Sequence, residues 1–138
     1  MIYSYSIIPQ DLTVNEDLVF TVDEIKTGCT VTHAAGTTTF VFNKPGYYYV
    51  TFNGVASATA AATDPITAEL YNGAVAIPGA LSSALSAAID TPVSLSISTI
   101  IQVRPNCPAI DNTVNLTVKN VGIEANYTNA TLTITKLC

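Results

Sequence analysis

The sequence has few charged residues, a single histidine and no tryptophan. Charged side chains make up 11% of the 138 residues, where a soluble domain usually has about a quarter. Five basic residues against ten acidic ones leave no positive face for phosphates, so nucleic acid is not an expected partner. No uncharged apolar run approaches the roughly 18 residues of a membrane helix, so membrane insertion is not expected. No signal peptide is visible at the start of the sequence.

Residues that commonly carry chemistry are also scarce. One histidine excludes a metal site of several imidazoles from one chain, and no phosphate loop, Gly-x-Ser-x-Gly or His-Glu-x-x-His motif occurs. Cys29 and His33 lie about 13 Å apart in an extended segment, beyond the ~3 Å of a nucleophile–base pair. We therefore expect a buried thiol and a partly exposed ring, no enzyme activity and no cofactor. Calcium on loop carboxylates stays open, although no Asp-x-Asp-x-Asp run supports it.

The three cysteines are Cys29, Cys107 and Cys138. No Cys-x-x-Cys pair occurs, which argues against structural zinc. Their odd number leaves at least one thiol free or bonded to another chain. Cys138 could pair with Cys107 or with another subunit, and free thiols are the simpler interpretation.

Patterns typical of β-strands occur along most of the sequence. Alternating apolar and polar residues, with turn residues between the runs, predict about eight to ten strands and almost no helix, typical of an antiparallel sandwich or barrel. Asn72-Gly73 predicts a two-residue hairpin turn. Ala80–Ala88 has leucines one helical turn apart, but its serines and flanking Gly79 and Pro92 favour an extended segment. We predict one all-β domain over residues 1–138.

Thr39–Asn53 is the most informative stretch, because it holds six of the eleven aromatic residues. Lys44-Pro45-Gly46 predicts the turn of a hairpin, and Asn53-Gly54 predicts a break after it. Strand alternation places Tyr48, Val50 and Phe52 on one face of the second strand and Tyr47, Tyr49 and Thr51 on the other. Both faces are largely apolar or aromatic, so each must be covered.

The middle of the chain is short of charge. Between Lys44 and Arg104 the only charged residues are Asp64, Glu69 and Asp90. Interfaces between identical subunits are depleted in charge at their centre. The pattern therefore favours an oligomer, and a monomer with a polar, uncharged surface is the alternative.

Several motifs resemble a known family. The series Phe40, Phe42, Pro45, Gly46, Tyr48, Val50 and Phe52 resembles the strand pattern of the complement globular-head and tumour-necrosis-factor jelly rolls. Glu69–Gly73 followed by Ile77–Ala80, and the ending Asn129–Leu137, resemble the bacterial branch of that superfamily. The resemblance spans Thr38 to Cys138, and the first 37 residues match only loosely. The chain contains no Gly-X-Y tract, so a collagen-like stalk would have to lie upstream or be absent.

The resemblance implies an antiparallel ten-strand jelly roll that assembles as a homotrimer around a threefold axis. It assigns Tyr47, Tyr49 and Thr51 to the trimer interface, although the opposite facing of this strand stays open. The expected subunit core comprises Phe40, Phe42, Tyr48, Val50, Phe52, Leu132 and Ile134.

The implied function is that of a non-enzymatic trimerising head domain. Such heads cap collagen-like proteins of the exosporium, other bacterial cell-surface proteins or phage fibres, and mediate assembly and recognition of a host-surface glycan or protein. The candidate recognition loops are Asp23–Cys29, Ala60–Pro65 and Arg104–Asn112. The alternative is a carbohydrate-binding module on a β-sandwich, which the lack of tryptophan disfavours.

Overall fold

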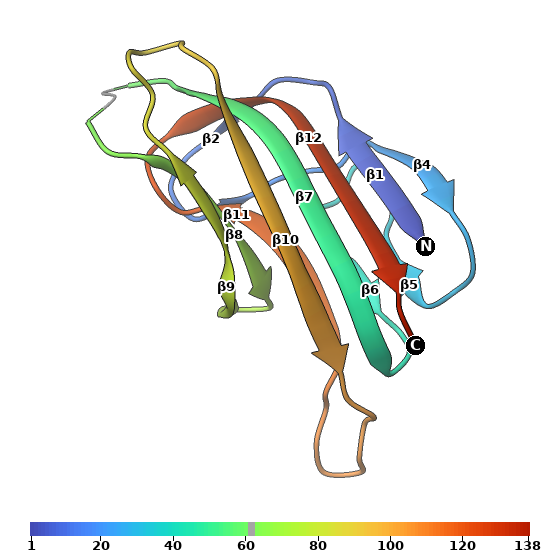
Figure 1. Ribbon diagram of the computed structural model, residues 1–138. Helices are drawn as coiled ribbons and strands as arrows, with labels where there is room; N and C mark the ends of the chain where they lie inside the picture. The colour runs from blue at the N-terminus through green and yellow to red at the C-terminus, as the bar shows by residue number, and fades with distance from the viewer. Residues whose placement is uncertain (61–62) are drawn as a thin grey trace.

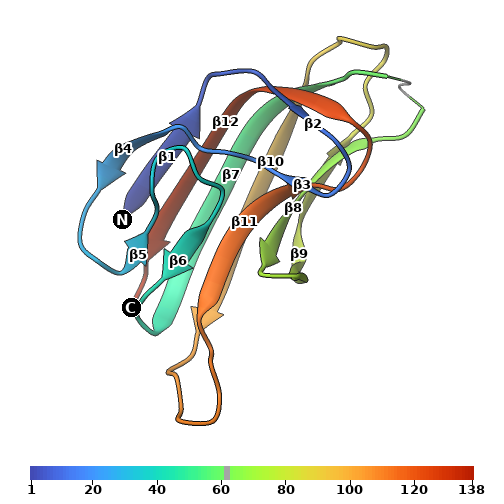
Figure 2. The same ribbon diagram turned by 180° about the vertical axis from the view of Figure 1, so that it is seen from behind.

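The computed structural model describes residues 1–60 and 63–138, and they form two antiparallel sheets packed face to face (Figures 1 and 2). No helix occurs in the described residues, and so none there is long and apolar enough to cross a membrane. The all-β sandwich predicted from the alternation pattern is confirmed.

The first sheet has the strand order β10-β7-β12-β1-β4, with β2 added beside β12. Its strands are β10 (Val93–Val103), β7 (Gly46–Ala58), β12 (Ala125–Lys136), β1 (Ile2–Ser6), β4 (Val22–Lys26) and β2 (Gln10–Leu12). The second sheet has the order β5-β6-β11-β8-β9, with β3 beside β11. Its strands are β5 (Val31–Thr32), β6 (Phe40–Phe42), β11 (Val114–Asn120), β8 (Ile66–Asn72), β9 (Val75–Ala84) and β3 (Glu16–Asp17).

The described chain thus has twelve strands where ten were expected. The difference lies in short pieces, because β3 and β5 have only two residues each. Both pair with longer strands of the second sheet, β3 with β11 and β5 with β6.

The predicted hairpin around Lys44-Pro45-Gly46 is wrong, because β6 and β7 lie in different sheets. The three residues instead carry the chain from one sheet to the other. Gly46 is required there, since its φ is +145° and a Cβ would lie 2.5 Å from the carbonyl oxygen of Cys138.

Strand β7 also continues through Asn53-Gly54, where a break was predicted. Both residues are paired on each side, with β10 and with β12. Gly54 serves packing, because a Cβ at this position would lie 2.8 Å from the Phe52 ring.

The β8–β9 hairpin is present, but its turn is shifted by one residue. Asn72 pairs with Val75, so the two turn residues are Gly73 and Ala74, and Gly73 has a φ of +59°. The Asn72 side chain is used elsewhere, since its Oδ1 accepts a hydrogen bond from the backbone N–H of Asn115 at 3.0 Å. The extended interpretation of Ala80–Ala88 holds as far as Ala84, where β9 ends, and the helical alternative is wrong there.

The hydrophobic core fills the space between the two sheets. The seven residues expected in it are all buried, namely Phe40, Phe42, Tyr48, Val50, Phe52, Leu132 and Ile134. The rings of Phe42 and Tyr48, from opposite sheets, meet edge to face with centroids 4.7 Å apart. The Tyr48 hydroxyl leaves the core to donate a hydrogen bond to the Lys44 carbonyl oxygen at 2.6 Å, which holds the connection between the sheets.

One buried polar network joins the sheets at Asn120. Its Nδ2 donates to the carbonyl oxygens of Leu12, Thr13 and Ile123, at 3.3, 3.3 and 2.8 Å. Its Oδ1 accepts a hydrogen bond from the Tyr127 hydroxyl at 3.0 Å, and burial raises the pKa of that hydroxyl above its ordinary value. Buried polar groups are tolerated when they are paired in this way.

Candidate functional site

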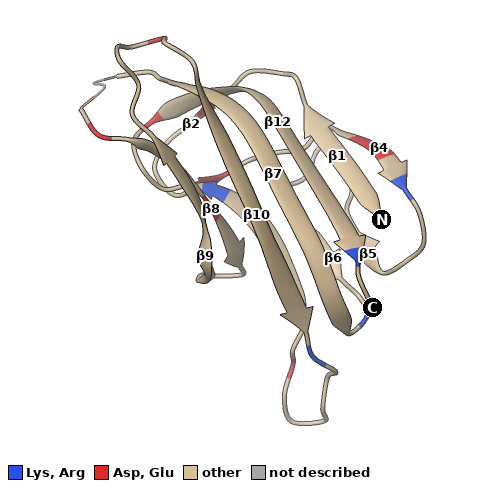
Figure 3. Cartoon of the chain, in the orientation of Figure 1, with Lys and Arg blue, Asp and Glu red and all other residues tan. Residues whose placement is uncertain are grey.

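The outer face of the first sheet is the most unusual surface of the described chain. On β10, β7, β12 and β1 the outward-facing side chains carry no charge, and Figure 3 shows this broad uncoloured area. We call it the uncharged face, and its members are Ser94, Ser96, Ser98, Ile100, Gln102, Tyr47, Tyr49, Thr51, Asn53, Thr131, Thr133, Thr135, Tyr3 and Tyr5. A surface of this size normally mixes both signs of charge.

Strand register arranges this face in rows of neighbours. Tyr49 lies between Ile100 of β10 and Thr135 of β12. Its hydroxyl lies 2.7 Å from the Ser98 Oγ, and the Tyr47 hydroxyl accepts a hydrogen bond from the Gln102 Nε2 at 3.3 Å. These bonds hold the two rings against the sheet instead of leaving them free in solvent.

Tyr47 and Tyr49 are 46% and 41% exposed, and Thr51 between the same strands is half-buried. All three therefore lie on the uncharged face, opposite the core residues of β7. The alternative facing of this strand, with Tyr47 and Tyr49 in the core, is wrong.

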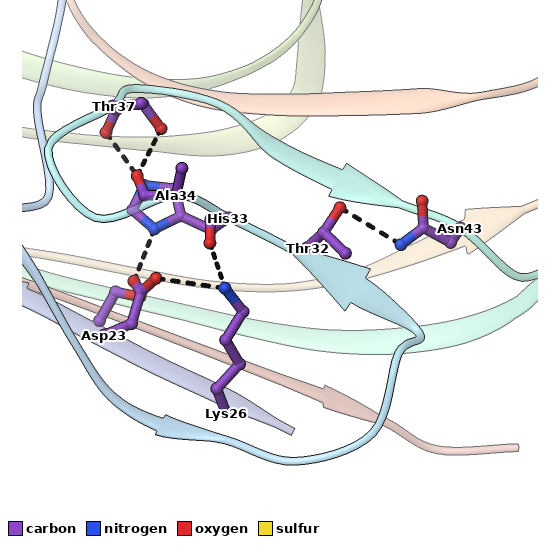
Figure 4. Close-up of polar contacts among 8 residues, drawn as sticks. Asp23, Lys26, Thr32, His33, Ala34, Thr37 and Asn43 are labelled. Carbon is purple, nitrogen blue, oxygen red and sulfur yellow. Dashed lines mark hydrogen bonds and ion pairs between the residues drawn. The ribbon is translucent and has the colours of Figure 1, made fainter.

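A partly buried polar cluster lies between β4, β1 and the segment after β5 (Figure 4). The Asp23 Oδ1 accepts a hydrogen bond from the Ser4 hydroxyl at 2.5 Å and lies 2.6 Å from the His33 Nδ1. The Lys26 Nζ lies 3.6 Å from the other Asp23 oxygen and donates to the His33 carbonyl oxygen. The His33 Nε2 lies 3.0 Å from the Thr37 carbonyl oxygen. Both ring nitrogens thus face oxygen atoms, so each nitrogen has a hydrogen-bond partner.

Burial of Asp23 opposes its ionisation, but hydrogen bonds from Ser4 and His33 and the positive charges of His33 and Lys26 outweigh this effect. The pKa of Asp23 therefore lies below its ordinary value. The cluster ties β4 to the following segment by charge-assisted hydrogen bonds.

The expectation for Cys29 and His33 is reversed in the structure. Cys29 is exposed, whereas His33 is only 3% exposed, because its ring stacks on Phe40 with centroids 4.0 Å apart. With both nitrogens engaged, His33 has no free nitrogen to accept a proton from a thiol or a substrate. Its place in the molecule is structural.

Cys107 and Cys138 are exposed as well, and all three thiols are free. Within residues 1–60 and 63–138, no group of three or more histidine, cysteine or acidic side chains is close enough to hold a metal ion.

The three loops proposed for recognition have different outcomes. Asp23–Cys29 is mostly strand, because β4 continues to Lys26. Ala60–Pro65 includes residues 61 and 62, which lie outside the described residues, so the structure does not test that prediction. Arg104–Asn112 is a loop that projects from the end of the sandwich where the two termini also lie (Figure 1).

Sequence reasoning missed the Asp23–His33 pair and the Asn120 network. Asn120 had a detectable signal, because it follows Val114, Leu116 and Val118 on the inward side of β11. No comparable signal joins Asp23 to His33, since their contact depends on the path of the chain between two sheets.

The fold resembles that of solved structures. No protein-family model and no curated protein matches the sequence. A solved structure of Eiger TNF from S. frugiperda superimposes with a TM-score of 0.70, covering 99% of this chain and 92% of that chain at 13% sequence identity. The chain therefore has a TNF-like jelly-roll fold.

Proposed function

We propose that the chain is a non-enzymatic, trimerising head domain that acts through assembly and surface recognition. The observation that carries the proposal is the uncharged face, which spans four adjacent strands and presents partly exposed tyrosines on two of them, β7 and β1. Centres of subunit interfaces are depleted in charge and enriched in tyrosine. Association of copies of the chain through this face would remove its uncharged and aromatic side chains from water.

A second surface can meet this face in the neighbouring copy. Strand β9 has no charged residue, and Leu81 and Leu85 are exposed on and just after it. Contact between two unlike patches generates a closed ring when the rotation between copies closes. Three copies are proposed because the sequence motifs resemble those of trimeric jelly rolls.

The setting proposed from the same motifs is a bacterial spore surface such as the exosporium, a bacterial cell surface or a phage fibre. A collagen-like stalk upstream would then carry the head, and its partners would be a glycan or protein of the surface that it meets. The TNF-like fold is compatible with this role and does not select among these settings.

Sedimentation velocity at low micromolar concentration tests the assembly. We expect a species of about three times the 14.5 kDa chain mass. The matched variants are Asn53→Lys, which places a charge on the uncharged face, and Asn115→Lys, which places the same charge on an exposed position of β11 in the other sheet.

We expect Asn53→Lys to sediment as a single chain and Asn115→Lys to keep the mass of the unmodified protein, because only the first leaves an unpaired charge in the interface. A single-chain mass for the unmodified protein, or equal masses for the two variants, contradicts the proposal.

A carbohydrate-binding module is the second candidate, and the exposure of Tyr47 and Tyr49 favours it, because exposed aromatic rings can stack on sugars. Binding to a glycan array that is lost in Tyr47→Ala, with the chain remaining a monomer, would support this alternative over assembly.

A further inference from the structure

A cavity of about 440 Å³ opens at the end of the sandwich, between the β6–β7 connection and the β10–β11 loop. Phe42 and Val103 lie buried at its base, and the exposed Pro45 and Pro105 line its two sides. Its volume lies in the range of about 300–1,000 Å³ that is usual for small-molecule sites.

Two of the five basic residues of this acidic protein, Lys44 and Arg104, line the same cavity. None of the described residues that line it is acidic. Asp111, the acidic residue of the β10–β11 loop, lines a neighbouring hollow that it shares with Arg104. Among the ion pairs of residues 1–60 and 63–138, none involves Lys44 or Arg104. Both cations are therefore available to a ligand.

The wall on the Lys44 side is held in place from the core. The Tyr48 hydroxyl donates to the Lys44 carbonyl oxygen, and the Asn43 side chain donates to the Cys29 carbonyl oxygen at 3.2 Å. At the far end of this connection, the Tyr47 backbone N–H donates to the Cys138 carbonyl oxygen at 3.2 Å and the Tyr47 carbonyl oxygen accepts from the Leu137 N–H at 2.8 Å.

The wall on the Arg104 side is held by bonds within its own loop. Asn112 donates from its backbone N–H to the Asn106 Oδ1 at 2.6 Å and from its side chain to the Pro105 carbonyl oxygen at 2.8 Å. Cys107 and Ile110 exchange two backbone hydrogen bonds at 3.0 Å each. A ligand would thus meet two walls that are already ordered, which lowers the entropic cost of binding.

We propose that this cavity binds a small anionic ligand, in which a carboxylate, sulfate or phosphate group is carried on a compact ring. The anionic group lies between Lys44 and Arg104, and the guanidinium can hold two of its oxygens at once. The ring packs between Pro45 and Pro105, which supply the exposed apolar surface of the cavity. This site is separate from the uncharged face and does not depend on the assembly proposed above.

The test is a titration of the ¹⁵N-labelled full chain, followed by amide chemical shifts, with three probes at matched ionic strength. The probes are sodium glucuronate, sodium sulfate and glucose. We expect glucuronate and sulfate to give saturating shifts confined to residues 43–46 and 103–113, with glucuronate the tighter of the two, and glucose to give none.

Three variants that each remove one positive charge complete the design. Lys44→Gln and Arg104→Gln should each weaken glucuronate binding by about tenfold, as loss of a hydrogen bond to a charged group does. Lys119→Gln is the control, because Lys119 lies on β11 beside Asp17 and away from the cavity. It should change the affinity less than about twofold, in the range of an exposed charge.

Shifts spread over the whole surface, an equal loss in Lys119→Gln, equal binding of glucose or no saturating shift with either anion would each overturn the proposal. The amide spectra report directly whether each variant is folded. A second measurement needs no variant. Chloride added to the unmodified protein with bound glucuronate should displace it, and the shifted amide signals should return toward their unbound positions.

Discussion

Truncation of Tyr49 is the sharpest test of assembly through the uncharged face. In Tyr49→Ala the core is untouched, because the ring lies outside the sandwich and its hydroxyl bonds only to the exposed Ser98 side chain. The substitution should therefore weaken association strongly and change the fold of the single chain little.

The size of the effect follows from the exposed area of the ring. At 41% exposure, Tyr49 still presents to solvent about 60–100 Å² of the 150–250 Å² that an aromatic side chain can bury. Burying that area contributes about 1.5–2.5 kcal/mol for each subunit, and roughly 5–8 kcal/mol for a trimer, as an upper limit.

The assay is sedimentation equilibrium over a dilution series, which measures the concentration at half-assembly. This concentration varies as the square root of a trimer dissociation constant, so Tyr49→Ala should raise it by roughly 60- to 700-fold. Val14→Ala is the control, because Val14 is an exposed apolar residue of similar exposure that lies between β2 and β3, outside the uncharged face and outside β9.

An unchanged midpoint in Tyr49→Ala would refute the reasoning, as would an equal shift in the control. A chain that stays monomeric at all accessible concentrations would refute it as well, because the uncharged face would then be stable in water.

Three further predictions concern stability. Tyr127→Phe should lower the free energy of unfolding in urea by about 1–3 kcal/mol, because it leaves the buried Asn120 Oδ1 without a donor, whereas Tyr49→Phe should change it by less than about 0.5 kcal/mol. The folded pKa of Asp23 lies below its unfolded value of 3.8, so its contribution is present above that pH and lost as the pH falls through the folded pKa. Asp23→Asn should therefore unfold with a weaker pH dependence below about pH 4, measured by thermal melts between pH 2 and 7. Gly46→Ala should lower the melting temperature by several degrees, because its Cβ would meet a backbone carbonyl oxygen at 2.5 Å; an unchanged melt would contradict the geometry.

The facing of β7 could be predicted well from the sequence. Strand alternation alone separates Tyr48, Val50 and Phe52 from Tyr47 and Tyr49, and the first three are buried in the structure. Alternation is a property of the extended backbone, so it needs no knowledge of the partner strands.

The connections were harder to predict. Lys44-Pro45-Gly46 has the residue types of a tight turn, because proline fixes φ and glycine permits a positive φ. The same residue types also suit a connection that passes from one sheet to the other. Asn53-Gly54 likewise has a turn signal, yet both residues are paired on two sides within β7. Pairing with distant strands outweighs local turn preference in each case, because a central strand gains hydrogen bonds and packing along its whole length.

The sequence by itself determined that this chain forms strands, which faces of those strands are apolar, and that its surface is poor in charge, because all three follow from the order and kind of side chains along an extended backbone. Only the tertiary structure decided that Asp23 meets His33, that the charge-free positions of β10, β7, β12 and β1 join into one face, and that Lys44 and Arg104 line the same cavity. The reason is that each of these depends on which strands pair across long separations in sequence. Such pairings are selected by the free energy of the whole sandwich and not by any local pattern.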